Sequence, residues 1–117
     1  MLTLSDKKIY LACGPTDMRK QINGLSAIVE GSFKLDPFSA LFVFCNRARD
    51  RLKILEWGGD GFWLYFKRLE KGRFRWPTAD ADEATMTLSR EELYHLLGGP
   101  GVTQKLKRDP VKIGKII

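Results

Sequence analysis

Residues 40–45, with the sequence ALFVFC, are apolar throughout. A strand that is apolar on both faces needs cover on both faces, so this segment predicts a central strand. Two more strand candidates follow: residues 50–57 alternate charged and apolar side chains in their first half, and residues 62–70 are aromatic and then basic. The linkers NRAR and GGDG have the length of hairpin turns, and the glycines of the second allow tight turns. The three segments therefore predict an antiparallel meander.

The residues before this meander predict a strand and then a helix. Residues 7–12 read as a strand that the Gly-Pro pair at 14–15 ends. Thr16 or Asp17 is a suitable N-cap for a helix that continues to about Glu30. The apolar residues of this helix have the spacing of a single helical face: Met18, Ile22, Leu25 and Val29. We therefore expect the helix to pack on the sheet.

The C-terminal part of the chain predicts one further helix. Residues 72–77 could add a short strand to the meander, and residues 78–84 read as an acidic, exposed loop. Ser89 is a suitable N-cap for a short helix that ends near Gly98. The complete pattern predicts an α+β fold, with an antiparallel sheet of about four or five strands, one helix packed on it and a short C-terminal helix. We expect one domain over residues 1–98 and a basic, flexible tail over residues 99–117.

Several classes of function lack the residues that they require. No apolar run approaches the ~20 residues of a membrane-spanning helix, and the first ten residues do not have the pattern of a signal peptide. Cys13 and Cys45 form no Cys-x-x-Cys pair, and His95 is the single histidine. We therefore expect a cytoplasmic protein without a metal site, a cofactor or a histidine-based catalytic pair.

Carboxylates also give little support to catalysis. Asp17, Asp50 and Asp60 could be imagined as a metal-binding cluster for phosphodiester cleavage. Each of them, however, suits a local role as a helix cap or a turn residue, and no motif fixes their mutual spacing. We therefore expect no catalytic residues in this chain.

The net charge of +6 is unevenly distributed along the chain. Residues 47–76 contain nine basic and four acidic residues, whereas residues 77–104 contain one basic and five acidic residues. Such a segregated field indicates a polyanionic partner for the middle of the chain. The alternative is a solvated basic face that serves solubility.

Two short stretches could supply phosphate contacts. Arg19 and Lys20 fall in the first turn of the expected helix, where they oppose the helix dipole unless an anion binds there. In the alternative, Asp17 caps the helix and pairs with Arg19 internally. The second stretch has cations at every other position, which places them on one face of an extended chain: Arg47, Arg49, Arg51 and Lys53. Its alternative is an exposed hairpin tip with pairs between arginines and Asp50.

Aromatic residues alternate with cations over residues 59–77. Lys67 and Arg73 are candidates for phosphate contacts there, and Trp63 and Trp76 are candidates for stacking on bases or for a protein interface. The alternative is that most of these aromatic side chains fill the core.

Four ordered motifs are similar to a known family. They are IYLACGPTDMRKQINGLSAIV, DPFSALFVF, RDRLKILEWGGDGFWLYFKRLEKGRFRWP and MTLSREELYHLL. Over about residues 7–97 the chain resembles the second-open-reading-frame (TnpB) accessory proteins of bacterial insertion sequences of family 66. The resemblance implies a chain encoded beside the transposase that assists transposition without cleaving DNA. Two features depart from the family pattern: Ser39 runs directly into the apolar strand, and the chain continues after the leucine-rich helix.

The residues and the resemblance together predict a non-catalytic accessory protein that binds element DNA. The predicted nucleic-acid-binding residues are Arg19, Lys20, Arg47, Arg49, Arg51, Lys53, Lys67 and Arg73. The alternative is a protein–protein adaptor, in which the basic ribbon docks on the transposase or on a second copy and Trp63 anchors the interface. The expected partners are therefore DNA, the transposase and other element-encoded proteins, and a second copy of the chain; no membrane is expected.

Overall fold

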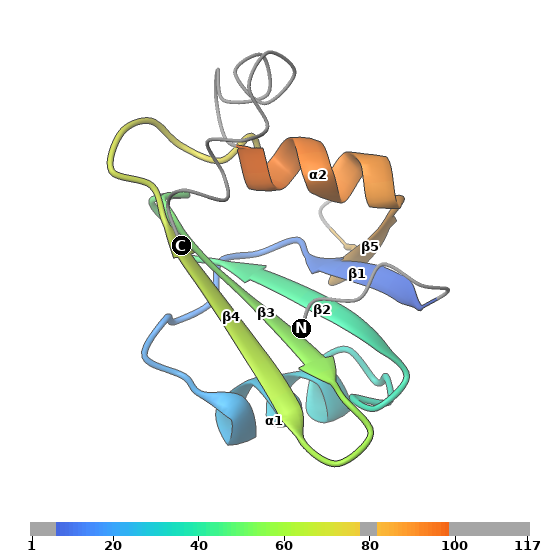
Figure 1. Ribbon diagram of the computed structural model, residues 1–117. Helices are drawn as coiled ribbons and strands as arrows, with labels where there is room; N and C mark the ends of the chain where they lie inside the picture. The colour runs from blue at the N-terminus through green and yellow to red at the C-terminus, as the bar shows by residue number, and fades with distance from the viewer. Residues whose placement is uncertain (1–6, 78–81, 99–117) are drawn as a thin grey trace.

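The computed structural model describes residues 7–77 and 82–98, which form a single sheet with one helix on each face (Figure 1). The spatial order of the strands is β4-β3-β2-β1-β5. In chain order the elements are β1 (Lys8–Ala12), α1 (Ile22–Gly31), β2 (Ala40–Cys45), β3 (Arg51–Trp57), β4 (Phe62–Arg68), β5 (Thr85–Leu88) and α2 (Arg90–Gly98). This arrangement confirms the predicted α+β class.

The sheet is mostly antiparallel, but β1 and β2 are parallel, with Tyr10 opposite Phe42. The expectation of a wholly antiparallel sheet was therefore wrong at this pair. The physical reason is the helix between the two strands, because a crossover through α1 returns the chain to the end of the sheet from which β1 started. The hairpins β2–β3 and β3–β4 are antiparallel, as expected for the meander.

The fifth strand is not the one that the sequence predicted. Residues 72–77 form no strand, since the Phe74 amide donates to the carbonyl of Arg49 in the β2–β3 turn, at 2.7 Å. The strand β5 instead precedes α2 and pairs with β1, with Ile9 opposite Leu88. Part of the predicted acidic loop, residues 78–81, lies outside the described residues, as does the predicted tail at 99–117.

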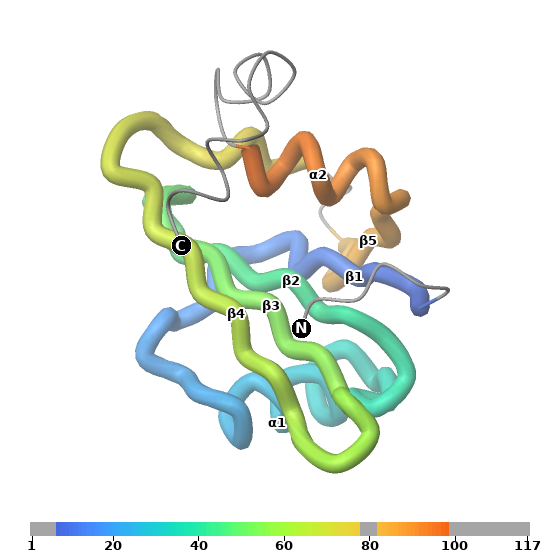
Figure 2. The backbone as a smooth tube through the Cα atoms, viewed as in Figure 1, coloured from blue at the N-terminus to red at the C-terminus, as the bar shows by residue number. Residues whose placement is uncertain are grey.

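Each face of the sheet has its own apolar core, and the backbone trace in Figure 2 shows α1 on one side of the sheet and α2 on the other. The core under α1 contains Phe42, Phe44 and Leu55 of the sheet together with Leu25 and Val29 of the helix. The core under α2 contains side chains from the opposite face of the strands, including Leu41, Val43, Ile54, Leu93 and Leu96. All six residues of β2 are buried, which is the covered central strand that its composition predicted.

The first helix begins at Ile22 rather than at residue 17, so Arg19 and Lys20 precede it. Asp17 caps a separate turn, in which its carboxylate accepts from the Arg19 amide at 2.9 Å and its carbonyl accepts from the Lys20 amide at 3.1 Å. The carbonyls of Met18 and Lys20 both accept from the ammonium of Lys53, at 2.8 Å each. A side chain from β3 therefore holds this segment, and helical bonds begin only after it.

The second helix starts with the expected cap. The Glu92 amide donates to the Ser89 hydroxyl at 3.1 Å, and the Ser89 amide donates to the Glu92 carboxylate at 2.7 Å. This reciprocal pair is a capping box, which satisfies amides that the helix itself cannot use. Neither helix of the described part of the chain is long and apolar enough to cross a lipid bilayer.

Candidate nucleic-acid interface

Three segments that are remote in the sequence meet at one end of the sheet, where β1, β2 and β4 end and β3 begins. The Thr16 amide donates to the carbonyl of Cys45, the last residue of β2, at 2.7 Å, which holds the first segment beside the start of the second. The Leu69 amide donates to the Asp50 carbonyl at 2.8 Å, which joins the second to the third. We call residues 15–21, 46–51 and 68–75 together the basic end.

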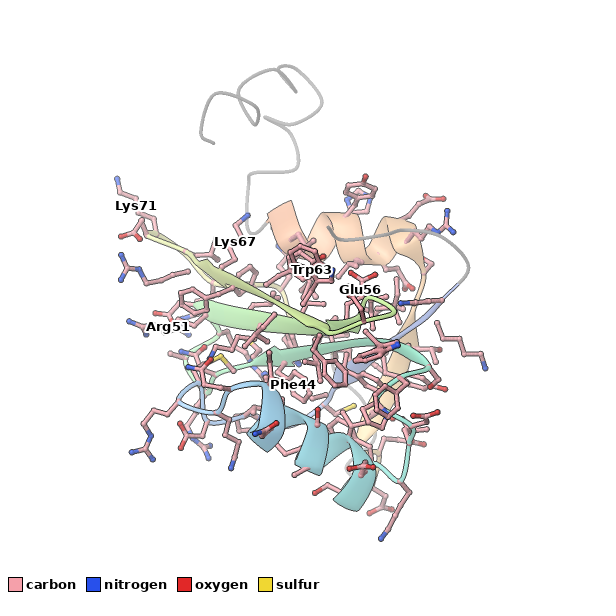
Figure 3. The ribbon with its side chains drawn as sticks, turned by 60° about the horizontal axis from the view of Figure 1, so that its bottom comes forward. Phe44, Arg51, Glu56, Trp63, Lys67 and Lys71 are labelled. Atoms are coloured by element: carbon pink, nitrogen blue, oxygen red, sulfur yellow. The ribbon has the colours of Figure 1, made fainter. Side chains whose placement is uncertain are left out.

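The basic end contains nine basic residues and three acidic ones. Arg51 and Arg68 lie opposite each other in the β3–β4 ladder. Figure 3 shows Arg51 and Lys71 at this end of the molecule, with Glu56 and Trp63 farther along the sheet. The clustering of cations that the sequence hypothesis required is therefore present for the residues of these three segments.

The turn between β2 and β3 is built around Asn46. Its side-chain oxygen accepts from the amides of Asp50 and Arg51, at 3.0 and 3.1 Å, and its side-chain nitrogen donates to the Asp50 carboxylate at 2.7 Å. Arg49 adopts a φ of 62° in this turn. The expected extended ribbon with four cations on one face therefore does not exist, because residues 47–50 turn and only Arg51 and Lys53 share a strand face.

Arg47 and Arg49 have different surroundings within this turn. Arg47 is exposed and makes no ion pair with any described residue. The guanidinium of Arg49 lies over the ring of Trp76, 5.3 Å from its centroid, and one of its terminal nitrogens, Nη1, is buried without a hydrogen-bond partner. Arg51 lies between these extremes: its side chain is 44% exposed and 3.5 Å from the Asp50 carboxylate.

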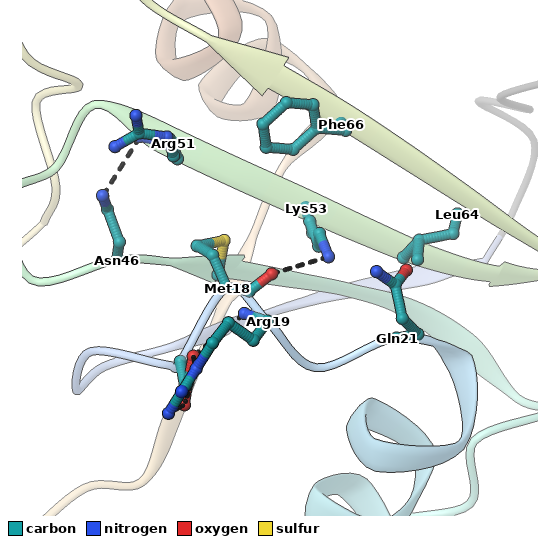
Figure 4. Close-up of a pocket in the computed structure, with 9 residues that line it drawn as sticks. Met18, Arg19, Gln21, Asn46, Arg51, Lys53, Leu64 and Phe66 are labelled. Atoms are coloured by element: carbon teal, nitrogen blue, oxygen red, sulfur yellow. Dashed lines mark hydrogen bonds and ion pairs between the residues drawn. The ribbon is translucent and has the colours of Figure 1, made fainter.

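A groove of about 700 Å³ opens between residues 17–21 and the sheet, on the same face of β3 and β4 as α1 but beyond the area that the helix covers (Figure 4). Its basic wall is formed by Arg19 and Arg51, and its apolar wall by Leu64 and Phe66. The Phe66 side chain is 55% exposed, although it belongs to a strand. The groove therefore presents an open aromatic ring beside cations.

Lys53 lies in this groove but is only 5% exposed. Its ammonium donates to the two carbonyls of the segment before α1 and lies 6.0 Å from the centroid of the Phe66 ring. Its direct bonds are therefore structural, and its charge lies under the groove rather than at its rim.

The Arg19 side chain is 92% exposed, and its Nε and Nη2 groups donate to the Asp17 carboxylate, with the shortest contact at 2.7 Å. The hydrogen bonds from Arg19 lower the pKa of the Asp17 carboxyl to about 2. Asp17 is therefore ionised at neutral pH and offsets the charge of Arg19, as the alternative interpretation of this stretch expected. Lys20 is exposed, and its stem runs beside Gly24, where an added Cβ would lie 3.2 Å from the Cβ of Lys20.

Lys67 and Trp63 point to the opposite face of the sheet from the groove. The Lys67 ammonium donates to the Leu97 carbonyl at 2.5 Å, near the end of α2. Trp63 is 51% exposed and stacks on Tyr65, with ring centroids 6.2 Å apart. These two residues therefore do not line the groove.

The loop after β4 contributes both structural and exposed residues. Phe74 is buried in the core under α2, and the indole nitrogen of Trp76 donates to the Ala12 carbonyl at 2.9 Å. The hydrogen bond to Ala12 attaches this loop to β1. Trp76 is half-buried and Arg49 lies over its ring, so the tryptophan has a structural role. The exposed cations of the loop make no ion pair with the described residues: Lys71, Arg73 and Arg75.

Sequence reasoning missed several residues at this end of the molecule. Phe66 was not among the predicted site residues, yet it lies opposite Lys53 in the ladder and on the same face as Arg51. The period-two alternation along the strand contains this information once the register is known. Gln21 of the groove, and Arg68, Lys71 and Arg75 of the third segment, were also absent from the predicted set.

The described residues contain no group of three or more histidine, cysteine or carboxylate side chains arranged to hold a metal ion. The two cysteines, Cys13 and Cys45, are free thiols, and burial raises the pKa of each. At this end of the molecule a ligand would meet exposed cations and the exposed ring of Phe66.

Comparisons with known proteins agree with the motif resemblance. A family model described as IS66 Orf2 like protein matches residues 7–107. The uncharacterized protein y4jC of Sinorhizobium fredii (strain NBRC 101917 / NGR234) is 37% identical over 106 residues, covering 90% of this chain and 88% of that protein. The uncharacterized protein y4hO of the same strain is 38% identical over 93 residues, or 79% of each chain. No solved structure matches the chain significantly.

Proposed function

Because this chain belongs to the IS66 Orf2-like family, we propose that it is a non-catalytic accessory protein of insertion-sequence transposition that binds nucleic acid through its basic end. The observation that carries this proposal is the convergence of residues 15–21, 46–51 and 68–75, joined by the hydrogen bonds described above. Six excess positive charges in these segments provide the attraction that phosphate backbones require.

We expect two parts of this surface to contact the nucleic acid: the exposed turn and loop, and the groove. Arg47 on the turn and Arg73 on the loop after β4 are exposed and without ion pairs among the described residues, which suits direct phosphate contacts. Arg51 and Phe66 line the groove, where a guanidinium binds phosphate and the ring supports a sugar or an unpaired base. Such contacts follow the phosphate backbone of the nucleic acid and provide little sequence specificity.

Fluorescence anisotropy with a labelled duplex tests this proposal. If about five phosphates are neutralised, log K should fall against log salt with a slope near −4 to −5. Arg47→Ala and Arg73→Ala should each weaken binding at all sequences and reduce the slope by about 1. Lys8→Ala is the matched control, because Lys8 is exposed at the start of β1, away from the basic end. A slope near zero, or equal losses in the control, would contradict the proposal.

Trp63 supports a second candidate function, that of a protein–protein adaptor within the transposition complex. A tryptophan that is 51% exposed on a strand is typical of an interface anchor. In this case the chain and the transposase should co-purify without DNA, and Trp63→Ala should weaken the complex while Arg47→Ala leaves it intact. Loss of the complex after nuclease treatment would instead assign the association to shared DNA.

A further inference from the structure

The strand β4 is an edge of the sheet formed by the described residues. Its sequence, FWLYFKR, contains no proline or glycine, and both of its faces carry exposed large apolar side chains, Trp63 on one and Phe66 on the other. The unpaired backbone groups of such an edge can pair with another strand, and natural proteins usually have features that prevent this pairing. The opposite edge, β5, has only four residues.

The hydrogen bonds at the two ends of the β3–β4 ladder fix which backbone groups of β4 point outward. The Gly58 amide donates to the Gly61 carbonyl, and the Leu69 amide donates to the Asp50 carbonyl. Because hydrogen-bonded pairs alternate with non-bonded pairs in an antiparallel ladder, Trp63, Tyr65 and Lys67 bond to β3. The outward N–H and C=O groups therefore belong to Phe62, Leu64, Phe66 and Arg68.

We propose that β4 pairs antiparallel with β4 of a second copy of this chain, about a two-fold axis that passes through Tyr65. In this register residue 62 lies opposite residue 68 of the second copy, and residue 64 lies opposite residue 66. All four outward-pointing residues then form hydrogen-bonded pairs, and the two sheets continue as one. Moving the axis to Leu64 or Phe66 leaves Arg68 or Phe62 without a strand partner, because the opposite residue would then be 60 or 70.

Side chains also match in this register. Trp63 of one copy lies opposite Lys67 of the other, and Phe62 lies opposite Arg68, so each cation meets an aromatic ring rather than another cation. Leu64 lies opposite Phe66, which brings two partly exposed apolar side chains together. The same patch is used by both copies, as a closed two-fold dimer requires. This inference does not depend on nucleic-acid binding.

Charge exchange across the interface tests the proposal in the full chain. Sedimentation velocity should show a dimer for the wild type and a monomer for Trp63→Lys, which places two lysines opposite each other. The double variant Trp63→Lys/Lys67→Glu should restore the dimer. The matched control Trp63→Lys/Arg68→Glu has the same net charge, but residue 68 points to the other face and should not restore it. Circular dichroism verifies that each variant is folded.

A wild-type monomer would overturn the proposal, as would a dimer that Trp63→Lys leaves intact or equal rescue by both double variants. Association of β4 only with another element-encoded protein would also overturn it, since the edge would then have a different partner.

Disulfide cross-linking tests the register separately. Tyr65 would face its own copy in a non-hydrogen-bonded pair, where Cα atoms lie about 4.5 Å apart and a disulfide can form. Tyr65→Cys should therefore cross-link under mild oxidation, while Leu64→Cys and Phe66→Cys should not. Wild-type protein measures the background from Cys13 and Cys45. Equal or faster cross-linking of the residue 64 or 66 variant would overturn the register.

Discussion

Lys53 shows how one residue can have basic character and a structural role. Its ammonium is buried because the carbonyls of Met18 and Lys20 replace the water that a lysine would otherwise bind. The sequence gives it the same alternating spacing as Arg51, so no local pattern separates the two. Lys53 is buried and holds residues 17–21 only because this segment crosses the sheet above it.

Lys53→Met should destabilise the protein by about 1–3 kcal/mol, because the partly buried carbonyls of Met18 and Lys20 lose their donor. Urea unfolding followed by circular dichroism measures this loss. Arg51→Met, two residues away on the same strand face, is the matched control and should change stability by about 0.5 kcal/mol or less, since Arg51 is partly exposed. Equal stability of the two variants would contradict the structural role of Lys53.

The pKa of Asp17 should rise when its partner Arg19 is removed. Its pKa lies at about 2, below the ordinary value of 3.8, because Arg19 donates hydrogen bonds to the ionised form. The pair therefore contributes its stability fully above pH 3.8 and loses it as the pH falls toward 2. In Arg19→Ala the pKa should rise toward 3.8, as measured by carboxyl NMR titration, whereas Arg51→Ala should leave it unchanged. A pKa that stays low in Arg19→Ala would show that Arg19 is not the cause.

At the scale of elements, strong local patterns were predictable and pairings were not. The apolar run 40–45 and the two segments after it became β2, β3 and β4, and Ser89 became the cap of α2. The sequence did not indicate β5, because four residues with two threonines have too short a pattern without β1 beside them. Residues 72–77 look like a strand locally, but the Phe74 amide bonds to the β2–β3 turn and the Trp76 amide bonds to the Phe74 carbonyl instead.

The cap of α2 offers a direct test at this scale. Ser89→Ala removes the acceptor of the Glu92 amide and should cost about 0.5–2 kcal/mol of stability. Ser89→Asp keeps an acceptor at this position and should stay close to wild type. Thermal unfolding measures both variants, and an equal loss in the two would mean that the hydroxyl does not act as a cap.

At the scale of the whole molecule, the candidate site depends on contacts between remote segments. The uneven charge of residues 47–76 was visible in the sequence and correctly indicated where cations concentrate. The sequence could not show that Lys67 points to the opposite face, or that Arg49 lies over Trp76, because both depend on strand register and loop packing. The groove beside Phe66 likewise exists only after residues 17–21 fold across β3.

An amide NMR titration of the full chain with a short DNA duplex tests the central claim most directly. Perturbed amides should concentrate in residues 15–21, 46–51 and 68–75, the three segments of the basic end, and the perturbations should fade as salt increases. Perturbations that concentrate in the hairpin loop at 58–61 or in α2, or a spectrum that DNA leaves unchanged at low salt, would contradict the account.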